Sequence, residues 1–253
     1  SVVYIYVSLN TTVAMQKKII IIGATSGIGR EMALLYLKRG DKVGITGRRQ
    51  HLLQELKTAY PQQVAISCFD VADEKCSFFL SALIEELGGM DLLIYNAGYG
   101  EVSNELNPAM DVTTIQTNVT GLVRLAANAF NYFTKKERGQ MALISSVASL
   151  RGNSWAPAYS ASKAFSSTYA EGLNMKAYRL GKDIVVTDVR PGFINTKPSR
   201  GNKRFWVASP QKAAQQIVAA IDKRKKKIYV TRRWWLVAQL LRCLPFQLYK
   251  RLG

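Results

Sequence analysis

Stretches typical of buried strands alternate with stretches typical of helices along almost the whole chain. The first is KKIIII at 17–22, a short continuous apolar run, as expected for a strand covered on both faces. Further strand-like runs stand at 41–46, 64–69, 91–98, 141–147, 183–192 and 226–231. Helical segments are expected at 28–40, 50–60, 73–89, 111–136, 157–180 and 209–223. The order predicts βαβ units and hence an α/β doubly wound parallel sheet, a three-layered Rossmann fold.

The chain divides into three parts. No linker interrupts the series, so residues 15–231 are expected to form one domain of this 253-residue chain. Residues 1–14 precede the first credible strand and are interpreted as an N-terminal extension, with an additional strand as the alternative. Residues 232–253 follow the last strand and are expected to form a basic, amphipathic helical tail.

A glycine-rich turn, GATSGIG at 23–29, lies between the first strand and the first helix. Glycines let a backbone approach phosphate groups closely, and a helix N-terminus favours an anion. The turn therefore predicts a nucleotide cradle, with glycines that merely close a tight turn as the alternative. Its spacing is GxxxGxG, whereas the general dinucleotide fingerprint is GxGxxG. The candidate cradle residues are Gly23, Thr25, Ser26, Gly27, Ile28 and Gly29.

The second strand ends in TGRRQ, where folds that bind NAD place an acidic residue for the ribose. Gly47 stands near that position, and Arg48 and Arg49 follow it. Two guanidinium groups suit the 2′-phosphate of NADP, so NADP(H) is the expected cofactor. Solvated arginines at a helix start are the alternative. Asp70, followed by Val71, ends the third strand, where a carboxylate either meets the adenine amine or caps the next helix.

Metal and disulfide chemistry find no support in the composition. The cysteines, Cys68, Cys76 and Cys243, are odd in number and match no zinc spacing, and His51 is the only histidine. We expect no metal site, and we expect a reducing, cytoplasmic location.

The stretch YSASK at 159–163 places a tyrosine four residues before a lysine, so that both share one helix face. A free tyrosine has a pKa of about 10, and a nearby ammonium group lowers it. Tyr159 is thus a candidate acid that gives a proton to a carbonyl oxygen as hydride arrives from a nicotinamide, with Lys163 beside it. Ser146, at the end of a predicted strand, is a candidate for orienting that oxygen. Ser145 competes for this role, and the spacing favours Ser146.

These motifs have the order and spacing of the short-chain dehydrogenase/reductase family, which the chain resembles over about 17–222. The resemblance implies that Tyr159 is the acid/base, that Lys163 also binds the nicotinamide ribose, and that Ser146 positions substrate. It implies that Asn118 holds a water in a proton relay; a plain buried asparagine is the alternative. Further implied cofactor contacts are Asn96, Ala97, Gly98, Pro191, Gly192, Ile194 and Thr196.

The resemblance implies an NADP(H)-dependent oxidoreductase that moves hydride between a nicotinamide and a ketone or secondary alcohol. A soluble 3-ketoacyl-thioester reductase and a non-catalytic NADP-sensing protein are the alternatives. Intact Ser146, Tyr159 and Lys163 argue against a sensor, because a sensor needs no proton donor. The C-terminal end departs from many family members, which favours a homodimer through the helices at 111–136 and 157–180 over a tetramer.

The formal net charge of +18 favours an anionic partner, and a solvated basic surface is the alternative. Part of the excess lies in KRKKK at 223–227 and in the tail. The tail combines arginines, two tryptophans and a helical sector of apolar residues: Leu236, Val237, Leu240, Leu241 and Leu244.

This combination predicts a helix on an anionic membrane surface, too short to span a bilayer. A helix packed over the substrate cleft or against a partner subunit is the alternative. Similar tails occur in family members that reduce lipid ketones. A lipid or lipid-linked ketone is therefore the expected substrate, with a peripheral contact to the cytoplasmic membrane face and no nucleic-acid partner.

Overall fold

One parallel sheet forms the middle of the structure, a computed structural model that describes residues 16–195 and 206–251. Within these residues the sheet has seven strands in the order β3-β2-β1-β4-β5-β6-β7. The strands are β1 (Lys18–Ile22), β2 (Lys42–Gly47), β3 (Val64–Cys68), β4 (Leu92–Tyr95), β5 (Arg138–Ile144), β6 (Asp183–Pro191) and β7 (Lys227–Val230). The predicted α/β fold is confirmed. Six strands lie inside or within one residue of their expected ranges, whereas β5 begins and ends three residues before the expected 141–147.

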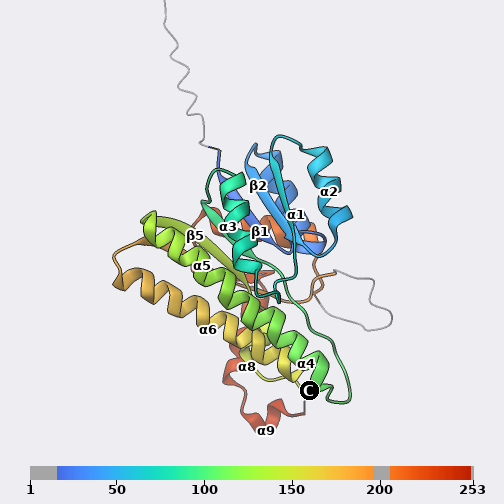
Figure 1. The fold of residues 1–253 in the computed structure, drawn as a ribbon. Coiled ribbons are helices and arrows are strands. Elements are labelled where there is room, and N and C mark those ends of the chain that lie inside the picture. Colours follow the sequence, from blue (N-terminus) through green and yellow to red (C-terminus); the bar gives the residue numbers. More distant parts are fainter. Residues whose placement is uncertain (1–15, 196–205, 252–253) are drawn as a thin grey trace, which may run out of the picture.

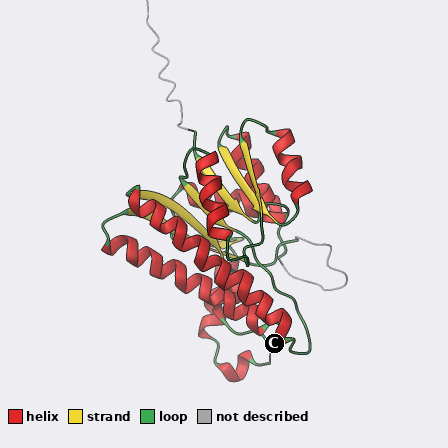
Figure 2. Ribbon diagram, in the orientation of Figure 1, coloured by secondary structure: helices red, strands yellow, loops and turns green. Residues whose placement is uncertain are grey.

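Helices cover both faces of the sheet (Figures 1 and 2). One face carries α1 (Gly27–Lys38), α2 (Gln50–Ala59) and α7 (Pro210–Asp222). The other carries α3 (Cys76–Glu86), α5 (Gly121–Lys135) and α6 (Pro157–Arg179). Shorter elements complete the described chain: α4 (Pro108–Ile115), the π-helical turn η1 (Gln116–Thr120), the 3₁₀ turn η2 (Val147–Leu150), α8 (Trp234–Cys243) and α9 (Phe246–Tyr249).

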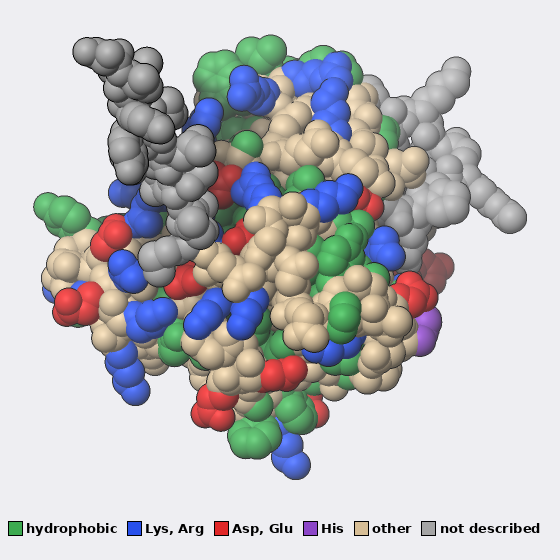
Figure 3. Space-filling view, turned by 90° about the horizontal axis from the view of Figure 1, so that it is seen from above, with side chains coloured by type: hydrophobic (Ala, Val, Ile, Leu, Met, Phe, Trp, Pro, Cys, Tyr) green, Lys and Arg blue, Asp and Glu red, His purple; other side chains and the backbone are tan. Residues whose placement is uncertain are grey.

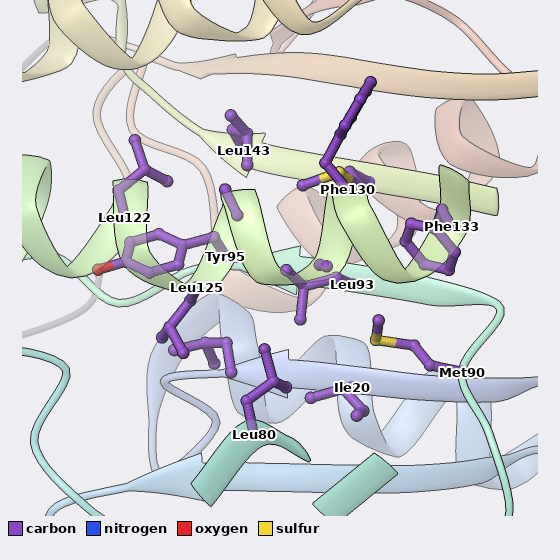
Figure 4. Packing of buried hydrophobic residues seen from close by; sticks show 14 of the residues in the cluster. Ile20, Leu80, Met90, Leu93, Tyr95, Leu122, Leu125, Phe130, Phe133 and Leu143 are labelled. Atoms are coloured by element: carbon purple, nitrogen blue, oxygen red, sulfur yellow. The ribbon is translucent and has the colours of Figure 1, made fainter. Parts of the chain in front are cut away.

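The isoleucine run of β1 explains why the strand lies at the centre. Successive side chains of a strand point to opposite faces. Ile20 and Ile22 therefore enter the core beneath α3, α5 and α6, whereas Ile19 and Ile21 enter the core beneath α1, α2 and α7. Figure 4 shows the first of these cores, where leucines and phenylalanines of α5 face β1, β4 and β5.

The helix expected at 111–136 is observed as three pieces, α4, η1 and α5. The π-helical turn inserts one extra residue per turn and so changes the direction of the side chains that follow it. It carries Asn118, which is fully buried. Periodicity alone does not reveal such a turn, because its apolar pattern resembles that of a continuous helix.

The topology fixes where a ligand can bind. β1 pairs with β2 on one side and with β4 on the other, so the chain reverses its direction of winding between β1 and β4. Ligands of doubly wound folds bind beyond the carboxyl ends of the strands at such a switch point. The glycine turn after β1 and the segment after β4 both lie there.

The C-terminal tail forms α8 and α9, which lie beside η2 and the first turns of α6 at the bottom of Figure 1. Trp234 and Ala238 are buried, whereas Leu236 and Leu240 are exposed. The apolar side of α8 is thus wider than the part that the domain covers. No helix in 16–195 or 206–251 is long and apolar enough to cross a membrane.

Candidate active site

The glycine turn after β1 is shaped for close approach of backbone. Gly23 has φ +86°, and a Cβ there would lie 2.8 Å from the backbone of Ala97. A Cβ on Gly29 would lie 2.2 Å from the carbonyl oxygen of Gly23. Asn96 at the end of β4 donates from Nδ2 to that same oxygen over 2.7 Å. The turn, the start of α1 and the segment after β4 are therefore locked together as one concave backbone surface.

Two arginines after β2 converge on this cradle. Arg49 donates to the hydroxyl oxygens of Thr25 (2.6 Å) and Ser26 (2.7 Å). Arg48 pairs with Asp70 after β3 over 3.5 Å. Asp70 also accepts from the backbone N–H of Ala72 and does not cap α3, whose first turn begins after Lys75. The guanidinium groups and Asp70 thus border the cradle where the adenosine half of a dinucleotide would lie.

The remaining predicted cofactor contacts differ in their surroundings, because some are buried in a hydrophobic core and others lie at the site. Gly27 begins α1 with φ +58°, and Ile28 is buried in the core beneath α1. Val71 belongs to the core beneath α3 and α5. Gly98 lies close to Lys163, because a Cβ on it would be 3.2 Å from Nζ.

Tyr159 and Ser146 meet at the carboxyl edge of the sheet. Tyr159 is in the first turn of α6, and its hydroxyl is hydrogen-bonded to Ser146. Ser146 follows β5; its Oγ donates to the carbonyl oxygen of Pro191 over 3.4 Å and accepts from the N–H of Ala148 over 3.1 Å. A carbonyl oxygen placed between these two hydroxyls would be within reach of both.

Ser145 has a different environment from Ser146. Its Oγ donates to Asp188 Oδ1 over 2.5 Å and to the carbonyl oxygen of Val189 over 2.9 Å, inside the sheet. Asp188 in turn pairs with the buried Arg190. Ser145 is therefore part of a structural polar network, and the geometry favours Ser146 as the substrate-facing hydroxyl.

Lys163 lies one helical turn after Tyr159 and is buried. Its Nζ is 5.6 Å from the centre of the Tyr159 ring and donates to the carbonyl oxygen of Ile144 over 2.9 Å. Burial lowers the pKa of Lys163 from 10.5 to about 8, because the charged form loses solvation.

The pKa of Tyr159 shifts in the opposite direction to the one expected from the sequence. Burial raises it, and the hydrogen bond with Ser146 lowers it by less. The expected lowering by the Lys163 ammonium is therefore not the dominant effect. A raised pKa keeps Tyr159 protonated at neutral pH, which is the state that a proton donor requires.

Asn118 is held rigidly in η1. Its Oδ1 accepts from the N–H of Tyr99, and its Nδ2 donates to the carbonyl oxygen of Tyr99 (2.7 Å) and to Ser162 Oγ (2.9 Å). A Cβ on Gly98 would lie 3.6 Å from Asn118 Oδ1 and 3.2 Å from Lys163 Nζ, so Gly98 separates the two side chains. The structure thus places Asn118 next to the Tyr159–Lys163 pair.

The segment after β6 forms the remaining wall. Pro191 contacts Ser146, and Gly192 donates from its N–H to the carbonyl oxygen of Val230 over 2.7 Å. Ile194 is bridged to Ala208. Thr196 lies outside the described residues.

Some residues of the site were not found from the sequence. A Cβ on Gly192 would lie 2.0 Å from the indole of Trp234, so Trp234 of the tail packs directly against the segment after β6. A Cβ on Gly100 would lie 2.3 Å from the ring of Tyr159. The glycine in NAGYG was the only available signal for Gly100, and nothing local in the sequence pointed to Trp234.

A cavity of about 270 Å³ borders Tyr159. Its walls come from the segment after β4, from α4 and from the segment before α6, and they include Glu101, Leu106, Met110 and Trp155. Tyr159 itself is one of the residues that line the cavity. Across 16–195 and 206–251, no cluster of histidine, cysteine or acidic side chains could hold a metal ion.

Comparisons with known proteins agree with this geometry. The family model described as short chain dehydrogenase matches residues 17–206. An uncharacterized oxidoreductase of Myxococcus xanthus is 34% identical over 193 residues, which cover 72% of this chain and 74% of that protein. A fatty acyl-CoA reductase of Acinetobacter baylyi is 32% identical over 224 residues, covering 84% and 75%.

Among solved structures, a short-chain dehydrogenase from Streptomyces avermitilis superposes with a TM-score of 0.77 at 26% identity, covering 86% of this chain and 88% of that one. The family match spans most of the described domain, including the glycine turn, Ser146, Tyr159 and Lys163. The chain therefore belongs to the short-chain dehydrogenase family and is an NAD(P)-dependent oxidoreductase.

Proposed function

We propose that this protein uses NADPH to reduce a lipid or lipid-linked ketone, as a homodimer that acts at a membrane surface in the cytoplasm. The observation that supports catalysis best is the contact of Tyr159 with Ser146, one helical turn from the buried Lys163. A protein that only sensed NADP would need none of these groups. Consumption of NADPH in the presence of long-chain ketones, measured by absorbance, tests the proposal.

In this proposal the chain's own residues bind the carbonyl and move the proton. Ser146 donates a hydrogen bond to the carbonyl oxygen and stabilises the negative charge that develops there. Tyr159 transfers its phenolic proton to that oxygen, and the Lys163 ammonium stabilises the phenolate that is left. Bound NADPH would supply the hydride that adds to the carbonyl carbon, which completes the alcohol and leaves NADP⁺. A proton from solvent then restores Tyr159, along the side lined by Lys163 and Asn118.

The choice of NADPH over NADH rests on Arg48 and Arg49. Both follow β2, at the place where an acid would receive the ribose hydroxyls of NAD. Arg49 is already held against the cradle by Thr25 and Ser26, so its cation is fixed beside the cofactor site. Guanidinium groups form strong charge-assisted hydrogen bonds with phosphate.

The substrate class rests on the walls around Tyr159 and on the tail. Leu106, Met110 and Trp155 contribute apolar surface to the cavity, which a long chain could contact, although polar and acidic residues also line it. The similarity to a fatty acyl-CoA reductase, which acts on a lipid thioester, supports the same class. A 3-ketoacyl thioester is the second candidate, and it is separated from free lipid ketones by comparing the two in the same assay.

The homodimer is proposed through α5 and α6. These two long helices lie side by side on one surface (Figure 1), and α6 exposes Phe165, Met175 and Tyr178. Sedimentation equilibrium tests this part, with an expected mass of twice the chain's 28.2 kDa.

The pH dependence of catalysis should follow Lys163. Its pKa of about 8 means that the ammonium loses its proton as the pH rises through that value, whereas Tyr159, with a raised pKa, stays protonated there. We therefore expect kcat/KM for NADPH, which reports the free enzyme, to fall as the pH rises through about 8. Lys163→Arg keeps its charge and should remove this descending limb from its residual activity. A level profile up to pH 10 in the unmodified enzyme contradicts this assignment.

Cofactor preference should depend on Arg48. Arg48→Asp replaces a cation by an anion that repels the 2′-phosphate and the nearby Asp70. A hydrogen bond to a charged group contributes about 1.5–3 kcal/mol, so the NADPH/NADH ratio of kcat/KM should fall by roughly 10- to 100-fold. Lys38→Asp makes the same change in charge at the far end of α1 and should leave the ratio as it was. An unchanged ratio in Arg48→Asp rules out this role for Arg48.

A further inference from the structure

The C-terminal helices have an inner side that the domain covers and an outer side that it leaves open. On the inner side, Trp234 and Ala238 pack with Tyr229, against Val147 and Leu150. Five large apolar side chains of α8 and α9 are nevertheless exposed: Trp235, Leu236, Leu240, Phe246 and Leu248. Phe246 also lines a cavity between α9 and the start of α6. Monomeric proteins rarely expose so many large apolar side chains close together without a use for them.

Basic side chains accompany this apolar group. We define the tail face as the five exposed apolar residues together with Arg232, Arg233, Arg242, Lys250 and Arg251, all of which are exposed. No aspartate or glutamate follows Asp222 in the sequence. The tail face therefore combines apolar surface with positive charge and contains no acidic residue.

The tail face is fixed in shape before it meets a partner. Arg151, which follows η2, donates from Nη1 to the carbonyl oxygens of Leu241 (3.1 Å) and Leu244 (2.8 Å) at the end of α8. Its guanidinium also lies 4.5 Å from the centre of the Tyr249 ring in α9. One side chain thus caps α8 and positions α9, so docking would not require these helices to become ordered first.

We propose that the tail face docks on an anionic lipid bilayer, with Leu236, Leu240 and Phe246 entering the headgroup boundary and the arginines meeting lipid phosphates. Interfacial helices carry this combination of a large apolar side with lysine and arginine around it. A second copy of the same face is disfavoured, because a symmetric contact would bring like charges together. A nucleic acid would use the cations but not the exposed leucines.

Positive charge alone does not distinguish the tail face. The KRKKK run at 223–227 leads into the first residue of β7, at the opposite end of that strand from α8. Figure 3, which views the side away from α8 and α9, also shows lysine and arginine side chains, there interleaved with acids. The tail face differs because its cations lie within a few residues of exposed apolar side chains in the sequence, with no acidic residue among them.

Flotation with vesicles tests the proposal directly. The full chain should bind vesicles of phosphatidylcholine with 30% phosphatidylglycerol much more tightly than vesicles of phosphatidylcholine alone. Raising the salt concentration should weaken this binding without abolishing it, because salt screens charges and not apolar contacts. The triple variant Arg232→Gln, Arg242→Gln, Lys250→Gln should bind roughly 100-fold more weakly at low salt.

Two matched controls make the outcome decisive. Lys223→Gln, Lys225→Gln, Lys226→Gln removes the same charge at the other end of β7 and should bind almost normally. Leu236→Gln with Leu240→Gln should lose roughly tenfold or more in affinity, whereas Phe78→Gln with Leu180→Gln, two exposed apolar residues outside the tail, should not. The proposal is overturned if the two triple variants lose equal affinity for the vesicles. It is also overturned if the unmodified chain does not bind anionic vesicles. The proposal deepens the membrane part of the proposed function, but vesicle binding needs no turnover, so failure of docking and failure of catalysis are seen separately.

Discussion

Tyr159→Phe is expected to lower the turnover number for ketone reduction by about 10²- to 10⁴-fold, the usual contribution of a positioned general acid. The substitution removes only the hydroxyl that meets Ser146 and leaves the ring, which packs against Gly100, in place. The glycine cradle, Arg48 and Arg49 are untouched, so the dissociation constant for NADPH should stay within a few fold. Stopped-flow reduction and fluorescence titration of NADPH measure the two quantities.

Tyr99→Phe is the matched control for this substitution. It also removes a phenolic hydroxyl close to the site, but that hydroxyl bonds to Glu101 and not to Ser146. Turnover of Tyr99→Phe should therefore remain within a few fold of normal. Near-normal turnover of Tyr159→Phe would mean that another group donates the proton.

Trp234→Ala is expected to lower the free energy of unfolding by about 3–5 kcal/mol, the usual cost of removing a buried aromatic side chain. Trp234 is 3% exposed and packs against Gly192, Tyr229 and Phe193. Urea denaturation measures the loss. Because Gly192 belongs to the segment beside Ser146, the variant should also bind NADPH more weakly.

Trp235→Ala is the internal comparison, since the neighbouring tryptophan is 52% exposed. Its free energy of unfolding should change by no more than about 0.5 kcal/mol. Deletion of residues 233–253 removes Trp234 as well and should destabilise the domain. Deletion of a tail that did not pack on the core would leave the stability of the domain unchanged. Equal stability of the two alanine variants would show that α8 does not pack on the domain.

The strands and the order of the site motifs could be predicted from the sequence because they depend on local patterns. A continuous apolar run such as KIIII is typical of a strand covered on both faces. Parallel strands bring their carboxyl ends to one edge of the sheet. A parallel sheet therefore predicts that four residues lie near one another: Gly23, Asn96, Ser146 and Pro191.

The contacts that could not be predicted join segments that are distant in the chain. Trp234 reaches Gly192 and Arg151 reaches the end of α8 only because β7 returns the chain to the edge of the site. The helical pattern of the tail indicated one apolar side, but it could not show which half the domain covers. The raised pKa of Tyr159 could not be predicted for a similar reason, since burial depends on the whole fold and not on the Tyr159–Lys163 spacing.

Transfer of deuterium from NADPH tests directly whether the protein reduces a ketone by hydride transfer. NADPH labelled with deuterium at the nicotinamide C4 is mixed with the protein and a panel of long-chain ketones, and the alcohols are analysed by mass spectrometry. We expect an alcohol with one deuterium on its carbinol carbon, formed by the unmodified protein and at least 100-fold more slowly by Tyr159→Phe. If the protein binds NADPH but only unreacted ketone is recovered, the proposed hydride transfer is contradicted.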